Sequence, residues 1–191
     1  MLIILGLGPG DASLLTREAW DVLSQAQAVY LRTRKHPTVK GLPSHLKLRS
    51  FDKVYESGED FAQVYETITQ KVLALARKGD VIYAVPGHPL VGQATVPKIL
   101  AQAKADGIPT RIVSGLSFIE PVLEAASAGG ETLDAMSGLQ IADGAEMAGM
   151  HHPPLNPDAP ALIGQVYSRA VASDVKLTLM NQYPPTHPVL V

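Results

Sequence analysis

The sequence predicts an α/β fold built around a mainly parallel sheet. Short runs of consecutive apolar residues, such as 2–5 and 81–85, indicate strands that are covered on both faces. Each run is followed by a loop rich in glycine or proline, and then by apolar residues at helical spacing. This alternation of strands and helices is typical of a parallel sheet. Apolar residues make up 46% of the 191 residues, which is enough for a packed core.

In the first part of the chain the pattern places the elements as follows. The strands are expected at residues 2–5, 28–31, 80–85 and 111–113. The helices are expected at residues 17–26, 61–78, 93–106 and 118–128. Thr16 has the side chain and the position of an N-cap for the first helix. Residues 34–58 have a mixed pattern, with Pro37, Gly41, Pro43 and Gly58 as punctuation, and no element is assigned to them.

The second part of the chain is less regular. Strands are expected at residues 139–141 and 161–166, and a helix at residues 168–181, with a loop over residues 151–160 that is rich in His, Pro and Asn. A further strand is expected to begin at residues 189–191. We therefore expect an N-terminal α/β lobe over residues 1–114 and a smaller mixed C-terminal lobe over residues 115–191. Because the chain stops in an apolar run, the second lobe is expected to be truncated.

The charge and composition disfavour several classes of partner. With 16 basic and 18 acidic residues the net charge is −2, which provides no electrostatic reason to expect nucleic acid or an anionic membrane. There are no cysteines, which excludes disulfides and thiolate metal sites and favours a reducing compartment. The apolar run at residues 2–5 ends at Gly6 and is too short for a signal peptide. We expect a soluble, cytoplasmic protein with a small-molecule substrate and no metal site.

Three loops have the sequence features of a ligand site. Each follows an expected strand and precedes an expected helix, and they cover residues 6–11, 86–92 and 115–117. In an open parallel sheet such loops lie at the carboxyl ends of the strands, where ligands bind. Each loop alone is compatible with ordinary turn chemistry, but three in equivalent places favour a binding cleft.

The first loop does not have the pattern of a nucleotide-phosphate site. A Gly-x-Gly-x-x-Gly motif would require glycine where Asp11 stands, and this carboxylate at a helix entrance would repel a phosphate. Pro9 also lacks the backbone N–H that a pyrophosphate site would use. A nicotinamide oxidoreductase is therefore disfavoured, and a P-loop is excluded because no Gly-Lys-Ser/Thr is present.

Two of these loops carry a family resemblance. The segment Ile4-Leu5-Gly6-Leu7-Gly8-Pro9-Gly10-Asp11, followed by Leu15-Thr16 and a helix, resembles the N-terminus of tetrapyrrole (corrin/porphyrin) methylases. The segment Tyr83-Ala84-Val85-Pro86-Gly87-His88-Pro89-Leu90-Val91-Gly92 resembles their second motif, with His88 in place of the usual aspartate. The Pro-Gly-His-Pro version, with Tyr65-Glu66-Thr67-Ile68 before it, resembles the subgroup fused to a MazG-type nucleoside triphosphate pyrophosphohydrolase. The sequence has no Glu-Glu-x-x-Glu helix of the MazG kind.

The resemblance implies two α/β lobes, a homodimer, and S-adenosylmethionine bound between the lobes. Carried over by motif, the residues expected at the cofactor are Pro9, Pro86, Gly87, His88, Val91, Ser117, Phe118 and Val166. Of these, Pro9 would cover the cofactor, the second loop would surround its methionine part, and Val166 would approach the adenosine. The family's last strands, which also touch the cofactor, lie beyond Val191.

The resemblance also implies methyl transfer by in-line displacement from a sulfonium. The cofactor supplies the reactivity, so the protein mainly has to align donor and acceptor. If the acceptor requires a base, His88 is the candidate, because it is the only group in the motifs that titrates near neutral pH. Arg32, at the end of an expected strand, is the candidate for binding a substrate carboxylate. The alternative is a regulatory domain that binds S-adenosylmethionine without turnover and is associated with a pyrophosphohydrolase.

Overall fold

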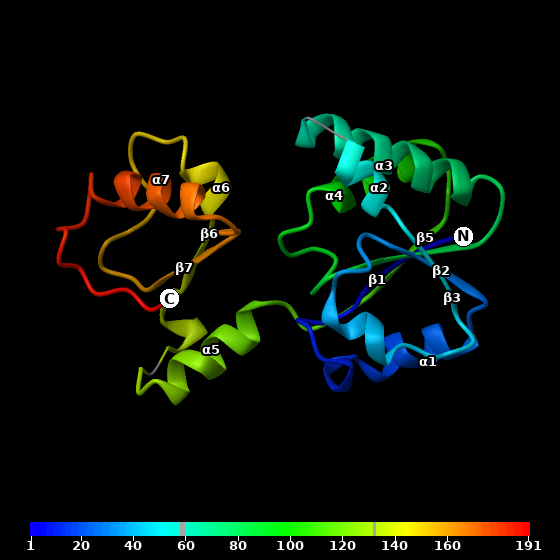
Figure 1. Ribbon diagram of the computed structural model, residues 1–191, viewed down its shortest axis with the longest axis horizontal. Helices are drawn as coiled ribbons and strands as arrows, with labels where there is room; N and C mark the ends of the chain where they lie inside the picture. Colours follow the sequence, from blue (N-terminus) through cyan, green and yellow to red (C-terminus); the bar gives the residue numbers. More distant parts are fainter. Residues whose placement is uncertain (58–59, 132) are drawn as a thin grey trace. The chain divides into compact units, whose positions relative to one another are not determined.

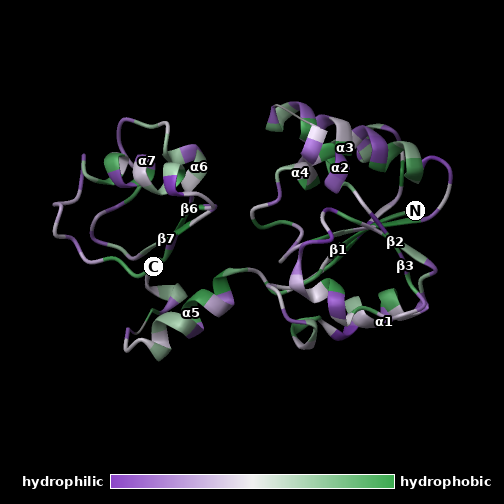
Figure 2. Ribbon diagram, in the orientation of Figure 1, coloured by the Kyte–Doolittle hydropathy of each residue, from purple (hydrophilic) through white to green (hydrophobic). Residues whose placement is uncertain are grey.

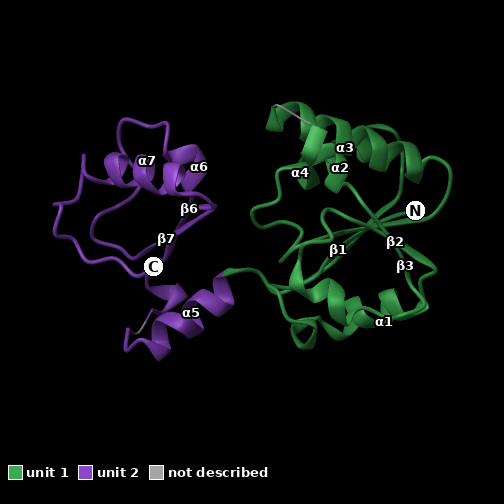
Figure 3. Ribbon diagram, in the orientation of Figure 1, with its two compact units in different colours: residues 1–118 green, residues 119–191 purple. Residues whose placement is uncertain are grey.

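The computed structural model describes residues 1–57, 60–131 and 133–191, which form two compact units, residues 1–118 and 119–191 (Figure 3). We expected the boundary after Ser114. It lies four residues further along the chain, because residues 115–118 belong to the first unit. The expected α/β fold with a mainly parallel sheet is confirmed.

The first unit is a parallel five-stranded sheet in the order β3-β2-β4-β1-β5. Its strands are β1 (Leu2–Gly6), β2 (Ala28–Leu31), β3 (Lys47–Ser50), β4 (Val81–Val85) and β5 (Thr110–Val113). The strands β1 and β4 are coloured mainly as hydrophobic in Figure 2. Their side chains are almost continuously buried, as a sheet covered on both faces requires.

Helices cover both faces of this sheet (Figure 1). The helix α1 (Arg17–Gln25) lies on one face, and α2 (Asp52–Ser57), α3 (Phe61–Ala76) and α4 (Thr95–Ala105) lie on the other. The Thr16 hydroxyl accepts the backbone N–H of Ala19, which confirms the predicted N-cap of α1. Short 3₁₀ turns, η1 (Ala12–Leu14) and η2 (Pro37–Gly41), complete the loops after β1 and β2.

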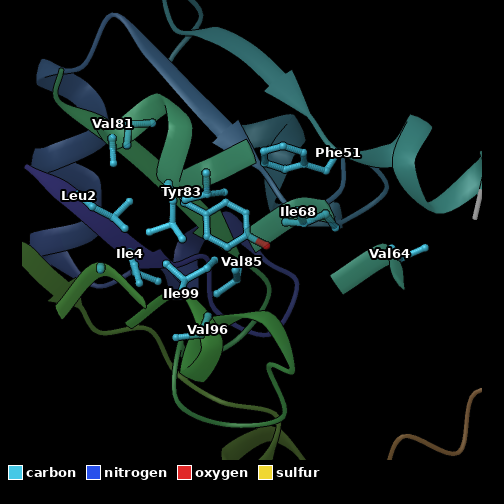
Figure 4. Packing of buried hydrophobic residues seen from close by; sticks show 14 residues of the cluster. Leu2, Ile4, Phe51, Val64, Ile68, Val81, Tyr83, Val85, Val96 and Ile99 are labelled. Carbon is cyan, nitrogen blue, oxygen red and sulfur yellow. The ribbon is translucent and has the colours of Figure 1, made fainter. Parts of the chain in front are cut away.

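Two apolar clusters form the core, one on each face. The cluster beneath α3 and α4 contains Leu2, Ile4, Tyr83, Val96 and Ile99, and the Tyr83 ring lies in its middle (Figure 4). The cluster beneath α1 is formed by Leu5, Leu7, Ala19, Leu23, Val29, Leu31, Leu46, Ala84 and Val113. Burial of this apolar surface fixes the sheet between its helices.

The second unit has a two-stranded parallel sheet and three helices in its described residues. Its elements are α5 (Ile119–Ala128), η3 (Ala135–Ser137), β6 (Gln140–Asp143), α6 (Gly144–Met147), β7 (Ala161–Gly164) and α7 (Arg169–Leu179). The Ser168 hydroxyl caps α7 by accepting the backbone N–H of Val171.

Two local features differ from the sequence analysis. The segment 34–58, to which the sequence analysis assigned no element, contains β3 and α2; Gly58 lies outside the described residues. Residues 189–191 form no strand: their side chains are exposed, and among the residues that the structure describes no strand pairs with their backbone. In the described ranges, no helix combines the length and the apolar character needed to cross a membrane.

Candidate functional site

The loops after β1 and β4 lie next to each other at the carboxyl edge of the sheet. β1 and β4 are paired in register up to Gly6 and Val85. Beyond them, Gly8 and Gly87 form an isolated bridge, in which the Gly87 N–H donates to the Gly8 carbonyl at 2.8 Å and the Gly8 N–H donates back at 3.3 Å. The two motifs that suggested a common site in the sequence are therefore hydrogen-bonded to each other.

These adjacent loops lead to opposite faces of the sheet. The chain passes from β1 through α1 toward β2, and from β4 through α4 to β5, on the other side of β1. This is a topological switch point, the place where ligands bind in open α/β sheets.

The third loop joins the first two through glycine backbones. A Cβ added to Gly6 would lie 2.5 Å from the Gly87 carbonyl oxygen and 2.7 Å from the Gly115 nitrogen. A Cβ added to Gly115 would lie 2.5 Å from the same Gly87 oxygen. The Thr16 hydroxyl also donates to the Ser114 carbonyl at 2.9 Å, which ties the start of α1 to this loop. Three backbones thus approach as closely as only glycine permits.

Within the first loop, Asp11 closes a turn and does not leave an anion site. Its carboxylate accepts the Ser13 N–H at 2.8 Å and the Ser13 hydroxyl at 2.7 Å. These two hydrogen bonds, the backbone one first, lower the pKa of Asp11. Pro9 is half-buried between Gly8 and Gly10, both of which have positive φ. The carboxylate therefore takes up the Ser13 N–H, a donor that a phosphate in this loop would need. This agrees with the sequence analysis, which disfavoured a nucleotide-phosphate site here.

In the second loop, Gly87 has a φ of +67°, in the left-handed region that favours glycine. Space alone does not require glycine here, because a Cβ would meet the Leu116 carbonyl oxygen and Ser117 Cα at 3.9 Å, ordinary contact distances. The requirement for glycine at position 87 is therefore one of backbone conformation. Pro86 and Val91 are half-buried beside it.

His88 uses one ring nitrogen in the fold. The Leu90 N–H donates to His88 Nδ1 at 3.1 Å, and the Val91 N–H donates to the His88 carbonyl at 3.1 Å. Because Nδ1 is the acceptor, the proton of the neutral imidazole is on Nε2. In this state His88 presents a hydrogen-bond donor to a ligand, which does not favour the role of general base considered from the sequence.

The remaining motif residues lie in different units. Ser117 is buried beside Gly87, and Phe118 is half-buried at the end of the first unit. Val166 belongs to the second unit, just after β7, and a Cβ added to Gly144 would lie 2.8 Å from its side chain. Gln165 before it has a φ of +60°, which is uncommon for a residue with a side chain and occurs most often at functional sites.

Arg32 lies at the same edge of the sheet as the three loops. Its backbone N–H donates to the Ala84 carbonyl at 2.8 Å, so it follows β2 directly beside β4. Its Nε donates to the Tyr55 hydroxyl at 2.9 Å and one terminal nitrogen donates to Gln93 Oε1 at 3.2 Å. The Gln93 amide in turn donates to the Pro86 carbonyl at 2.8 Å. Sequence reasoning selected Arg32 but missed Tyr55 and Gln93, which are distant along the chain.

Behind the first loop, two buried polar atoms also escaped sequence reasoning. A Cβ on Gly10 would lie 3.9 Å from Pro37, which places η2 against the loop. Within the described part of the chain, neither His36 Nδ1 nor Thr38 Oγ1 has a hydrogen-bond partner. Burial lowers the pKa of His36, so this imidazole is kept neutral.

Sequence comparison identifies related proteins. The family described as Tetrapyrrole (Corrin/Porphyrin) Methylases matches residues 1–191. The chain is 32% identical to "Uncharacterized protein YabN" of Bacillus subtilis (strain 168) over its whole length, and 30% identical to diphthine methyl ester synthase of Aspergillus fumigatus over 64% of its length. It spans only 37% and 41% of these two relatives.

Structural comparison agrees with the sequence relationship. Uroporphyrin-III-C-methyltransferase from Thermus thermophilus superposes with a TM-score of 0.67 at 25% identity, covering 96% of this chain and 75% of that protein. Cobalt precorrin-4 methyltransferase, at 18% identity and a TM-score of 0.57, shares the fold over 94% of this chain and 74% of its own.

Proposed function

Because the chain belongs to the tetrapyrrole (corrin/porphyrin) methylase family, we propose that it is an S-adenosylmethionine-dependent methyltransferase. The observation that supports this most is the convergence of three loops at the switch point of the sheet, where Gly6, Gly87 and Gly115 bring their backbones together. Neither Gly6 nor Gly115 has room for a side chain beside the Gly87 carbonyl, which suits a rigid cradle for an extended ligand.

We assign parts of the cofactor to individual residues. Pro9 covers it from the first loop, while Pro86, Gly87, His88 and Val91 surround its methionine part. Ser117 and Phe118 complete this side, and the family motif alone assigns Val166 to the adenosine. When bound, S-adenosylmethionine supplies an activated methyl group on a sulfonium.

In this proposal the protein aligns the acceptor with the methyl donor and excludes water. His88 contributes through Nε2–H as a hydrogen-bond donor, because Nδ1 accepts the Leu90 N–H. An acceptor that needs deprotonation would therefore obtain its base from another group or from solvent. We expect the largest effect of His88→Ala on ligand orientation, and a smaller effect on cofactor affinity than that of a Gly87 substitution.

A second candidate is an S-adenosylmethionine-binding domain without turnover, associated with a MazG-type nucleotide pyrophosphohydrolase. The chain covers only 37% of its Bacillus relative, so such relatives contain more than this fold. The hydrogen bond that engages His88 Nδ1 also leaves the second motif without a base.

Two measurements test the proposal and separate the candidates. Calorimetry with S-adenosylmethionine and S-adenosylhomocysteine should show binding by the wild-type chain, and absence of binding to both would refute both candidates. An assay with labelled methyl groups should show transfer to a porphyrinogen acceptor. Binding without transfer to any acceptor offered would favour the domain without turnover.

A further inference from the structure

Arg32 is a half-buried cation held by neutral groups. Besides the hydrogen bonds to Tyr55 and Gln93, its guanidinium lies 5.7 Å from the centroid of the Tyr55 ring. Burial is the largest single influence on the pKa of Arg32 and acts to lower it, but the combined effects of the Tyr55 hydroxyl and, more weakly, of Tyr83 and Tyr65 outweigh burial, and the net pKa is raised. The side chain is therefore charged, and it is kept in place by aromatic and amide groups.

No carboxylate compensates this charge within the described ranges. The ion pairs found there involve Arg17, Arg77, Arg111 and the N-terminal amine. Asp52, which is on the same helix as Tyr55, accepts the Thr33 hydroxyl at 2.6 Å and the Arg34 N–H at 3.0 Å. Taking a cation out of water without an anionic partner is costly, and such a group is usually paired when its site is occupied.

The cluster is connected to the proposed cofactor loop. Gln93 accepts from Arg32 through its oxygen and donates to the Pro86 carbonyl through its nitrogen. Pro86 precedes Gly87, and Arg32 itself is bound to Ala84 of β4 by its backbone. An anion at Arg32 would therefore lie on the same edge of the sheet as the second motif.

We propose that Arg32, Tyr55 and Gln93 recognise a carboxylate of the methyl acceptor, an inference that rests on the proposed methyltransferase function. A guanidinium binds a carboxylate through two parallel N–H donors, and both terminal nitrogens of Arg32 retain donors beyond those that Tyr55 and Gln93 use. The single positive charge of the cluster matches one carboxylate better than the higher charge of a pyrophosphate. Tyr55 and Gln93 hold the planar group in orientation before the ligand arrives.

The experiment uses two anionic probes and three variants. Uroporphyrin carries several carboxylates, and its binding is followed by absorbance; inorganic pyrophosphate is titrated in parallel by calorimetry. Arg32→Gln removes the charge, and Tyr55→Phe removes only the hydroxyl. Arg49→Gln is the matched control, because Arg49 also lies 5.7 Å from a tyrosine ring, that of Tyr30, but is exposed on the edge strand β3. Affinity for S-adenosylhomocysteine is measured for every variant.

We expect Arg32→Gln to weaken uroporphyrin binding at least about tenfold and Tyr55→Phe to weaken it about two- to tenfold. Arg49→Gln should leave it unchanged, and all three variants should bind S-adenosylhomocysteine within about twofold of wild type. The carboxylate assignment is overturned if the wild-type chain binds no uroporphyrin, if Arg32→Gln binds it as well as wild type does, or if only pyrophosphate binding depends on Arg32. If Arg32→Gln does not fold, an unchanged affinity in Tyr55→Phe overturns the role of the cluster. Failure of the wild-type chain to bind S-adenosylhomocysteine would refute the proposed function instead.

Discussion

The close approach of the three loops makes Gly6→Ala the most informative perturbation. The new Cβ would lie 2.5 Å from the Gly87 oxygen, 2.7 Å from the Gly115 nitrogen and 2.9 Å from the Gly115 Cα, whereas ordinary contact begins at 3.4 Å. All three neighbours are backbone atoms on loops that adjoin paired strands, so no side chain can rotate away. The overlap is relieved only if the loops separate.

The cost of such overpacking is about 1–3 kcal/mol, or roughly 5- to 150-fold in the folding equilibrium constant. The single tryptophan, Trp20, lies in α1 of the first unit and reports its unfolding by fluorescence in a urea titration. We expect the midpoint of Gly6→Ala to fall accordingly, and its affinity for S-adenosylhomocysteine to fall as well. Gly79→Ala is the matched control, because a Cβ on Gly79 meets nothing within 4 Å.

A double substitution sharpens the test. Gly115→Ala would collide with the same Gly87 oxygen at 2.5 Å, so a loop that has moved for one methyl group has partly made room for the other. The double variant should therefore lose less stability than the sum of the single losses. If Gly6→Ala unfolds at the same urea concentration as wild type and Gly79→Ala, the three loops do not meet as described.

Three further predictions follow from the same structure. Gly87→Val places a branched side chain at a φ of +67°; calorimetry should show affinity for S-adenosylmethionine weakened at least about tenfold, roughly 1.4 kcal/mol, and an unchanged affinity would remove this loop from the site. Burial lowers the pKa of His36 below 6.5, so the stability contributed by the neutral imidazole is fully present above that pH and is lost as the pH falls below it. Urea titrations from pH 7.5 to 5 should show a smaller loss for His36→Gln than for wild type or for His45→Gln, an exposed control; equal losses would contradict the assignment. We also expect a homodimer, on the basis of the family resemblance and of exposed apolar side chains such as Phe61, and sedimentation showing a monomer at micromolar concentration would count against it.

Local sequence signals determined which segments form the central elements. The apolar runs of β1 and β4 predicted strands buried on both faces, and Thr16 predicted the start of α1, because burial pattern and capping depend on a few consecutive residues. The signals failed where burial is partial. β3 is an edge strand whose four residues alternate between exposed and half-buried, and α2 has only six residues, too few for a helical period to stand out. The apolar residues 189–191 show the opposite error, since a strand also needs a neighbour to pair with.

Only the tertiary structure decided which distant residues meet. The sequence indicated three glycine-containing loops, but the placement of β4 and β5 on either side of β1 is what brings Gly6, Gly87 and Gly115 into contact. Likewise, Arg32 was recognisable as a cation at the end of a strand, while its enclosure by Tyr55 and Gln93 depends on segments 23 and 61 residues away. Periodicity along the chain reports which face of an element is buried, whereas strand order and side-chain partners are selected by packing across the whole sheet.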